Sequence, residues 1–158
     1  MIKTCTQCSI VVTQRNTSKG KRICKQCEQE NGKVYRTRIK YHVLRHYGKD
    51  NQAQCTCCGE TRIEFLTLDH TNNNGGEERK ALRAKGSAAG AGGWKFYHYI
   101  RTCGYPDGYT TLCFNCNSAR GAYGYCPHDT ESDKRAYIDS LLQRFENEEH
   151  VQKEKEIV

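Results

Sequence analysis

The chain contains little apolar material and no long apolar run. Hydrophobic residues make up 36% of its 158 residues, and its mean hydropathy is −0.88. No stretch approaches the roughly 18 apolar residues that a membrane span needs, so we expect a soluble protein without a membrane partner. The shortage also leaves little for a large hydrophobic core, in a chain with room for one ordinary domain or two small ones. Something other than hydrophobic burial must hold the fold together.

An apolar signal segment is also missing after Met1, which bears on how the eleven cysteines are interpreted. Disulfides would be expected of so many cysteines in a secreted protein. Eight of them, however, fall into four C-x-x-C steps, the spacing of zinc-binding thiolates. We therefore favour reduced cysteines that bind zinc over disulfides, in a cytoplasmic, intracellular protein that lies in the host cell if the chain is viral.

Acidic residues are scarce in the first third of the chain. Residues 1–54 carry twelve Lys or Arg against three acids, whereas residues 128–158 carry five against nine. A basic segment of this kind is typical of nucleic-acid binding, because each neutralised phosphate releases condensed counterions. A merely solvated surface is the alternative, and charge alone does not decide between the two.

The first two C-x-x-C steps predict a zinc ribbon over residues 1–30, in which the metal replaces a hydrophobic core. Its ligands are Cys5, Cys8, Cys24 and Cys27. Basic residues between the two steps favour contact with DNA over a purely structural ribbon. They are Lys19, Lys21 and Arg22.

Residues 31–49 predict a basic linker helix that ends at Gly48. Its apolar positions at helical spacing are Val34, Tyr35, Ile39, Val43 and Tyr47. Basic residues fill the other positions, so the helix can follow a phosphate backbone, pack its apolar stripe against the next domain, or do both.

Three later segments are expected to flank the functional centre. The glycine-rich residues 72–93 predict a long mobile loop, interpreted as a flap that orders on a substrate, and residues 94–103 predict a short helix with core aromatics. Residues 129–158 predict a C-terminal helix and charged tail, opened by Thr130 and Asp133 as a capping box. We expect its apolar stripe to pack on its own domain, with a homodimer through this helix as the alternative.

The other two C-x-x-C steps bracket a group of polar residues within residues 50–128. A second closed, tetrahedral zinc site is predicted from Cys55, Cys58, Cys113 and Cys116. Residues 65–68 predict a short strand that leads into Asp69 and His70, and Asn117 directly follows the last cysteine. Neighbouring strand residues project to opposite faces, so one of the pair can bind a cation while the other faces a substrate. Taken alone, the pair would be interpreted as a capped strand end with a histidine whose ring nitrogens are hydrogen-bonded within the fold.

The order of three short motifs in this chain resembles that of the HNH endonucleases. The motifs are C-x-x-C, then Leu-Asp-His, then Leu-Cys-x-x-Cys-Asn. The resemblance is specifically to the ββα-metal subgroup with a four-cysteine zinc, which includes phage HNH proteins and the recombination endonuclease VII family, and it covers about residues 50–128. The resemblance implies that His70 is the general base that activates water. It also implies that Asp69 and Asn117 hold one catalytic Mg²⁺ or Mn²⁺, while zinc is a scaffold.

Two positions depart from the pattern of that family. Gly108 stands where many HNH proteins carry a middle Asn that braces the loop and orients the histidine, so Asp107, Asn72 or a backbone carbonyl must substitute. Asn72 also stands where the endonuclease VII branch has a further histidine, which favours plain nicking or cleavage over junction resolution.

A few residues near the zinc ligands have less certain tasks. Arg120 is either a phosphate clamp or a surface arginine, and Cys103 is expected to be a buried small residue. Cys57 could in principle replace one of the two ligands beside it, but Cys58 is preferred because Gly59 permits the tight turn after it. Cys126 and His128 either pack against the zinc module or join a third site, and no firm role is assigned to these three residues.

The sequence thus predicts an α+β protein of small zinc-stapled modules: a zinc ribbon, a basic linker helix, a ββα-metal domain and a C-terminal helix. The predicted function is hydrolysis of DNA phosphodiester bonds, by nicking or double-strand cleavage. The alternative is a non-catalytic zinc-ribbon protein that binds DNA in transcription, and a nuclease directed at RNA is a third option.

Overall fold

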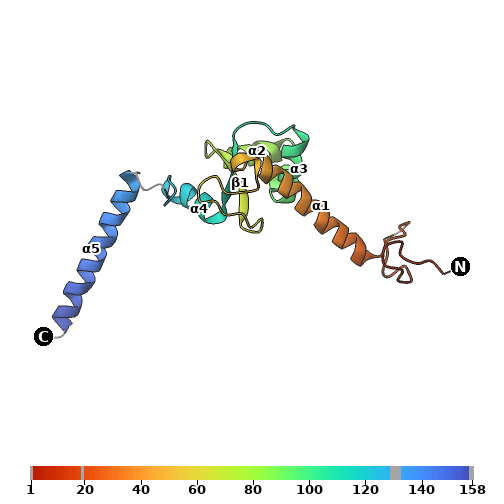
Figure 1. Ribbon diagram of the computed structural model, residues 1–158, viewed down its shortest axis with the longest axis horizontal. Helices are drawn as coiled ribbons and strands as arrows, with labels where there is room; N and C mark the ends of the chain where they lie inside the picture. The colour runs from red at the N-terminus through yellow and green to blue at the C-terminus, as the bar shows by residue number, and fades with distance from the viewer. Residues whose placement is uncertain (1, 19, 129–132, 157–158) are drawn as a thin grey trace. The chain divides into compact units, whose positions relative to one another are not determined.

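The computed structural model describes residues 2–18, 20–128 and 133–156, with side chains described up to residue 148. In this part of the chain the fold is mixed α/β, with five α-helices, two short 3-10 helices and a two-stranded antiparallel sheet (Figure 1). The elements are α1 (Lys25–His46), η1 (Lys49–Asn51), β1 (Leu66–His70), α2 (Gly75–Ala84), η2 (Ala88–Ala91), α3 (Trp94–Thr102), β2 (Tyr109–Cys113), α4 (Phe114–Tyr123) and α5 (Asp133–Glu156). None of the described helices has both the length and the apolar character that a bilayer crossing requires.

Contacts along the chain divide it into two compact units. The first unit consists of Met1–Val43 and Glu77–Pro106, and the second of Leu44–Gly76 and Asp107–Val158. This division groups the residues differently from the four segments expected from the sequence, because residues 77–106 belong with the N-terminal residues. Each unit contains one of the two predicted four-cysteine sets.

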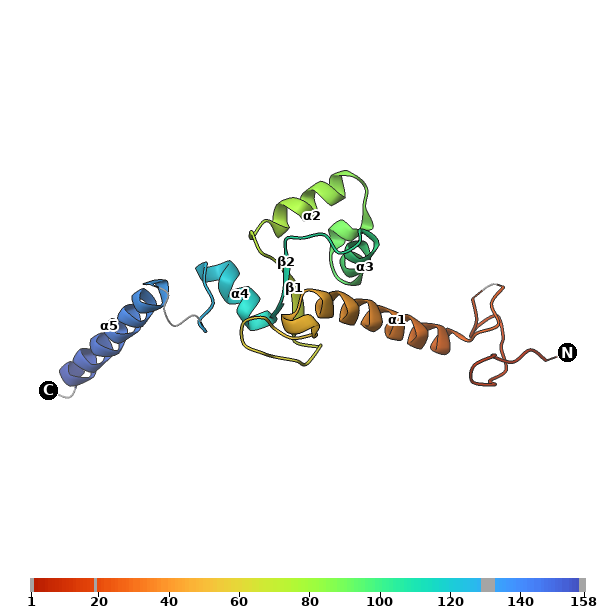
Figure 2. The same ribbon diagram turned by 45° about the horizontal axis from the view of Figure 1, so that its top comes forward.

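The sheet of the second unit is a pair of short strands followed at once by a helix. β1 and β2 pair antiparallel, with Leu66 opposite Cys113 and His70 opposite Tyr109, and α4 begins directly after β2 (Figure 2). Side chains along β1 alternate between buried and half-buried, as expected of a strand with one covered face. The predicted strand is therefore confirmed, and it extends through the Asp-His pair that follows it.

Thr111 of β2 holds the end of α1 within the second unit. Its side chain is fully buried, and its Oγ1 donates a hydrogen bond to the carbonyl oxygen of Leu44 over 2.7 Å. Its backbone N–H donates to the carbonyl oxygen of Tyr47 over 3.0 Å. The last carbonyls of a helix have no partner inside the helix, so the strand satisfies groups that α1 and its end would otherwise leave unpaired.

The predicted linker helix is confirmed, but α1 starts at Lys25, inside the second C-x-x-C step of the ribbon. Only part of its predicted apolar stripe is buried: Ile39 is 1% exposed, whereas Val34 and Tyr35 are 50% and 46% exposed. Tyr35 instead lies beside His98 of α3, with its hydroxyl 3.3 Å from Nδ1.

The prediction of a mobile loop over residues 72–93 is wrong. α2 and η2 occupy most of this segment, and Leu82 of α2 is buried. The glycines misled the interpretation, because at least one of them serves close packing: a Cβ at Gly90 would lie 2.8 Å from the backbone nitrogen of Arg83. The short helix predicted next is confirmed as α3, whose Phe96 and Ile100 are buried.

The predicted C-terminal helix is present as α5, and three of its described apolar side chains are largely exposed. Tyr137, Leu142 and Phe145 are all more than half exposed. The expectation that this stripe packs on its own domain is therefore wrong for these three residues. Thr130, the predicted cap, lies outside the described residues, and a homodimer through α5 remains a prediction.

Candidate metal centres

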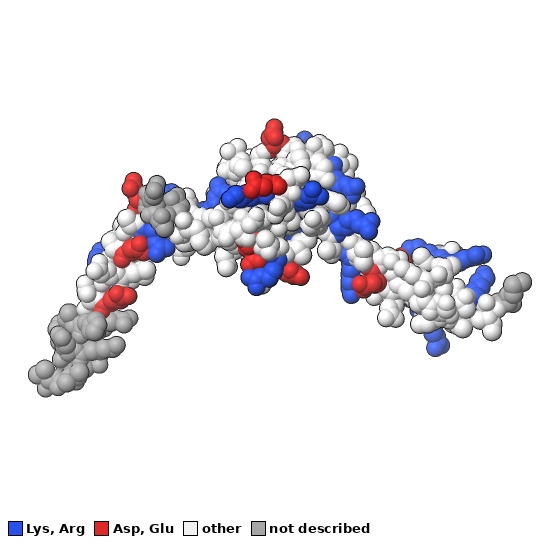
Figure 3. Space-filling view, in the orientation of Figure 1, with Lys and Arg blue, Asp and Glu red and all other residues white. Residues whose placement is uncertain are grey.

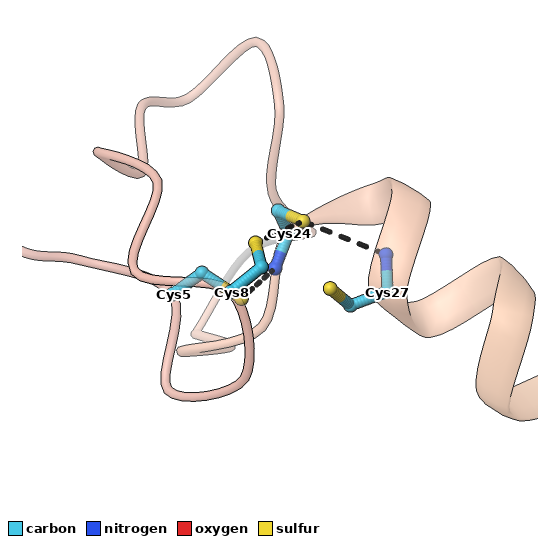
Figure 4. A group of neighbouring side chains, drawn as sticks. All are labelled: Cys5, Cys8, Cys24 and Cys27. Atoms are coloured by element: carbon cyan, nitrogen blue, oxygen red, sulfur yellow. Dashed lines mark hydrogen bonds between the residues drawn. The ribbon is translucent and has the colours of Figure 1, made fainter.

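The first candidate metal centre lies in the first unit, where two loop cysteines meet two cysteines at the start of α1. Figure 4 shows the side chains of Cys5, Cys8, Cys24 and Cys27 directed toward one another. Their sulfur atoms all lie within 4.8 Å of one another, and the sulfurs of Cys8 and Cys24 are 3.7 Å apart. A tetrahedral zinc with bonds of about 2.3 Å to sulfur separates its ligands by about 3.8 Å, so the set fits the metal that the spacing predicts.

The second candidate centre ties the 55–58 step to the junction of β2 and α4. Its ligands, Cys55, Cys58, Cys113 and Cys116, also have all their sulfur atoms within 4.8 Å of one another. The sulfurs of Cys58 and Cys113 are 3.6 Å apart. The chain turns tightly after Cys58 at Gly59, whose φ of +78° is one that other residues rarely adopt. Both predicted four-cysteine sets are therefore assembled by the fold.

The two centres share one construction, in which a C-x-x-C step opens a helix. Cys113 caps α4, and its sulfur accepts a hydrogen bond from the N–H of Cys116 over 3.4 Å. In the same way the sulfur of Cys24, just before α1, accepts from the N–H of Cys27 over 3.5 Å. In both centres, therefore, the second C-x-x-C step lies at the N-terminal end of a helix, where a backbone N–H group reaches the sulfur of its first cysteine.

Hydrogen bonds and burial act in opposite directions on these thiols. The N–H of Cys24 and then that of Gln7 lower the pKa of Cys5 to about 6. At Cys55 burial opposes ionisation, but hydrogen bonds from backbone N–H groups outweigh it and lower the pKa to about 7. Burial, followed by its sulfur neighbours, raises the pKa of Cys116 far above the ordinary range. Four crowded thiols of this kind ionise together only when a cation replaces their protons.

The three predicted catalytic residues lie on two elements of the second unit, β1 and α4. Asp69 and His70 are the last two residues of β1, and Asn117 lies in the first turn of α4, next to the zinc ligand Cys116. The Asp69 side chain is 13% exposed and faces α4, where its Oδ2 lies 3.3 Å from Nη1 of Arg120. Arg120 therefore pairs with the predicted metal ligand, and its contact with a phosphate stays a prediction.

His70 is buried and lies beside Tyr109, the residue opposite it on β2. The centroids of the two rings are 4.9 Å apart and their planes are tilted by 58°. Directly after His70 the pairing of the two strands continues, because the carbonyl oxygen of Gly108 accepts a hydrogen bond from the N–H of Thr71 over 3.0 Å. Gly108 has a φ of +100°, so a residue with a side chain would be strained there. The bond to Thr71 is formed by the backbone carbonyl at position 108, and which group orients the ring of His70 stays a prediction.

Three residues without an assigned role form a third group beside the second centre. Cys57, Cys126 and His128 surround the sulfur of Cys116, and all four ligand atoms lie within 4.8 Å of one another. The sequence signal was present in the odd Cys57 and in Cys126-Pro-His128, but no spacing rule connected residues so far apart in the chain. Cys103, by contrast, is exposed, so the prediction that it is a buried small residue is wrong.

The segment predicted as a zinc ribbon also lines a basic groove of about 740 Å³, whose lining includes Lys3, Lys21 and Arg22. Lys21 is partly neutralised there by an ion pair with Glu28. Lys and Arg atoms are visible on this ribbon and along α1 (Figure 3). The groove is large enough for a stretch of phosphate backbone, although its positive charge alone does not identify what binds.

Comparisons of this chain with protein-family models, with curated proteins and with solved structures found no match.

Proposed function

We propose that this protein is a metal-dependent DNA endonuclease that hydrolyses phosphodiester bonds with His70 as the general base. The observation that carries the proposal is the ion pair between Asp69 on β1 and Arg120 on α4. It fixes which face of α4 looks toward the acidic residue of the sheet. In this proposal, the candidate metal ligands of strand and helix form one site.

The position of Asn117 follows from helical geometry. Residues three apart on a helix are neighbours on one face, so Asn117 lies one turn before Arg120 on the face that meets Asp69. A carboxylate and an amide oxygen are hard donors, which suit a cation such as Mg²⁺ or Mn²⁺ that keeps much of its water shell. When bound, such a cation supplies positive charge to the scissile phosphate and its leaving oxygen.

The chain's own residues supply the remaining tasks. His70, on the opposite face of the strand end, takes a proton from the attacking water, which an imidazole does efficiently near neutral pH. Tyr109 and the hydrogen bond at Gly108 orient its ring and the loop after it. Arg120 pairs with Asp69 before DNA is bound and is placed to contact a phosphate oxygen afterwards.

Positive charge in the N-terminal part of the chain supplies DNA affinity. Lys33, Arg36 and Arg38 are exposed on α1, and the groove of the ribbon adds Lys3 and Arg22. Contacts of this kind bind phosphate without reading sequence, so we expect affinity to fall steeply as salt rises.

Plasmid cleavage tests the proposal. Purified full-length protein is incubated with supercoiled plasmid in buffer containing Mg²⁺, Mn²⁺ or no added divalent cation, and nicked and linear products are separated on a gel. Omitting the cation is preferable to adding a chelator, because a chelator also attacks the zinc centres. We expect cleavage only with Mg²⁺ or Mn²⁺.

Matched variants separate catalysis from folding. His70→Ala and Asp69→Asn are expected to lower the cleavage rate by at least about 100-fold with zinc content and DNA binding retained, since general base catalysis contributes about that much or more. His98→Ala, at an exposed histidine of α3, is expected to cleave like the wild type. Wild-type protein that binds DNA but leaves the plasmid intact with every cation would instead support the non-catalytic DNA-binding function. Cleavage of RNA alone would redirect the proposal to that substrate.

A further inference from the structure

The group formed by Cys57, Cys126 and His128 has the composition and spacing of a metal site. The sulfur atoms of Cys57 and Cys126 are 3.1 Å apart. Nδ1 of His128 lies 3.3 Å from the sulfur of Cys126, 3.5 Å from that of Cys116 and 3.7 Å from that of Cys57. Four soft donors therefore face one point, from three separate stretches of the second unit.

These distances resemble those around tetrahedral zinc. With bonds of about 2.3 Å to sulfur and about 2.0 Å to nitrogen, a tetrahedral ion holds sulfur and nitrogen about 3.5 Å apart. The three distances from the imidazole match this value closely. The distance between the sulfurs of Cys57 and Cys126 is shorter than the expected 3.8 Å or so, but it is far longer than the bond of about 2.05 Å in a disulfide.

We propose that the second unit binds a further zinc ion through Cys57, Cys126 and His128, with the thiolate of Cys116 bridging this ion to the zinc held by Cys55, Cys58 and Cys113. Cys116 is the one ligand common to both groups, and it is almost completely buried between them. A thiolate has several lone pairs and can bind two metal ions at once.

The charges of the ligands agree with a second ion at this position. Cys57 and Cys126 add two thiolates, which balance the two positive charges of an additional Zn²⁺, and a neutral imidazole adds none. The formal charge of the pair of sites is therefore the same as that of the first site alone. If the additional ion had a third unshared thiolate, in place of Cys116 or His128, the buried cluster would carry one more negative charge.

The backbone explains how the distant ligands reach this point. Cys57 lies between Cys55 and Cys58, and the N–H of Thr56 donates to the carbonyl oxygen of Thr111 over 2.9 Å, which fixes the 55–58 step against β2. After α4 the chain turns at Gly124, which has the left-handed φ of 76°, and this turn precedes the segment that carries Cys126 and His128. The additional zinc ion would connect the segment that carries Cys126 and His128 to the start of α4, close in sequence to Asn117.

The zinc content of the intact protein tests the proposal. Full-length protein, purified with zinc and freed of loosely bound metal by gel filtration, is analysed for metal and protein content. We expect three zinc ions per chain, one for each of the three groups of ligands. His128→Ala is expected to lower the content by one ion, whereas Cys103→Ser, which removes an exposed cysteine outside every group, is expected to retain all three.

A second measurement keeps the test decisive if His128→Ala does not fold. Native mass spectrometry of the wild type alone reports both the number of bound zinc ions and any disulfide, which lowers the mass by two hydrogens. A wild-type content of two ions overturns the proposal, and so does a disulfide between Cys57 and Cys126. Three ions that persist in folded His128→Ala protein overturn it as well.

Discussion

Replacing Thr111 by Val tests whether β2 stabilises the end of α1 as the structure indicates. The substitution preserves the shape of a fully buried side chain and removes only the hydroxyl that donates to the Leu44 carbonyl over 2.7 Å. A hydrogen bond of this kind contributes about 1 kcal/mol, and a buried acceptor without its partner costs about 1–3 kcal/mol. We therefore expect the second unit to lose about 1–2 kcal/mol of stability, without the further cost of a cavity.

Hydrogen exchange of the strand amides measures this loss in the right place. The single tryptophan, Trp94, belongs to the first unit, so its fluorescence does not report on the sheet. A loss of about 1–2 kcal/mol makes exchange in β1 and β2 faster by about 5- to 30-fold at a fixed free zinc concentration. Thr110→Val is the matched control, because Thr110 is only half-buried and the hydrogen bond between its hydroxyl and that of Thr56 is exposed to solvent. Equal exchange rates in wild type and Thr111→Val, or an equal acceleration in both variants, would refute the reasoning.

Three further predictions concern glycines, DNA affinity and zinc. Gly48→Ala is expected to destabilise the second unit by about 1–3 kcal/mol, because its Cβ would lie 1.8 Å from the carbonyl oxygen of Gln52, whereas Gly121→Ala, in open space on α4, is expected to stabilise it by about 0.5–1 kcal/mol. Thermal melts at fixed free zinc compare the two, and a neutral Gly48→Ala would contradict the close approach. Changing Arg36 and Arg38 to Gln is expected to make the affinity for DNA less dependent on salt. The slope of log affinity against log salt should become shallower by about 0.9 for each phosphate that these side chains no longer neutralise. An unchanged slope would show that these arginines of α1 do not contact DNA. Removing zinc with a strong chelator is expected to unfold both four-cysteine centres and to lower the helix content measured by circular dichroism. Recovery of the helix content on addition of Mg²⁺ alone would contradict this prediction.

The spacing of cysteines predicted more of this molecule than its hydrophobic pattern did. Each C-x-x-C step brings two ligands together locally, so the sets that contain Cys5 and Cys55 were readable without knowledge of the fold. The strand at β1 and the helix at α3 were readable as well, because apolar residues at a regular spacing preceded clear turn signals.

Elements whose burial depends on a partner were the ones that the sequence misjudged. α2 was taken for a loop because glycine usually signals freedom, yet Gly90 is small so that η2 can approach the backbone of α2 at Arg83. Cys103 and Tyr137 were judged apolar enough for a core, but the residues around them in sequence do not determine whether anything covers them. A third site was one of two options for Cys126 and His128, but the part that Cys57 takes in it was not foreseen, because Cys57 and Cys126 are 69 residues apart in the chain.

The segment from Thr111 to Arg120 combines tasks that are usually spread over a domain. Thr111 secures the end of α1, Cys113 and Cys116 close the second metal centre, and Arg120 holds Asp69. Because Asn117 stands between the candidate zinc ligand Cys116 and Arg120 on the same helix, we expect metal binding to position the proposed site directly. Loss of zinc from this centre should therefore abolish the proposed cleavage even though zinc takes no part in its chemistry. A site that tolerated removal of Cys113 would require some other element to hold α4 against β1.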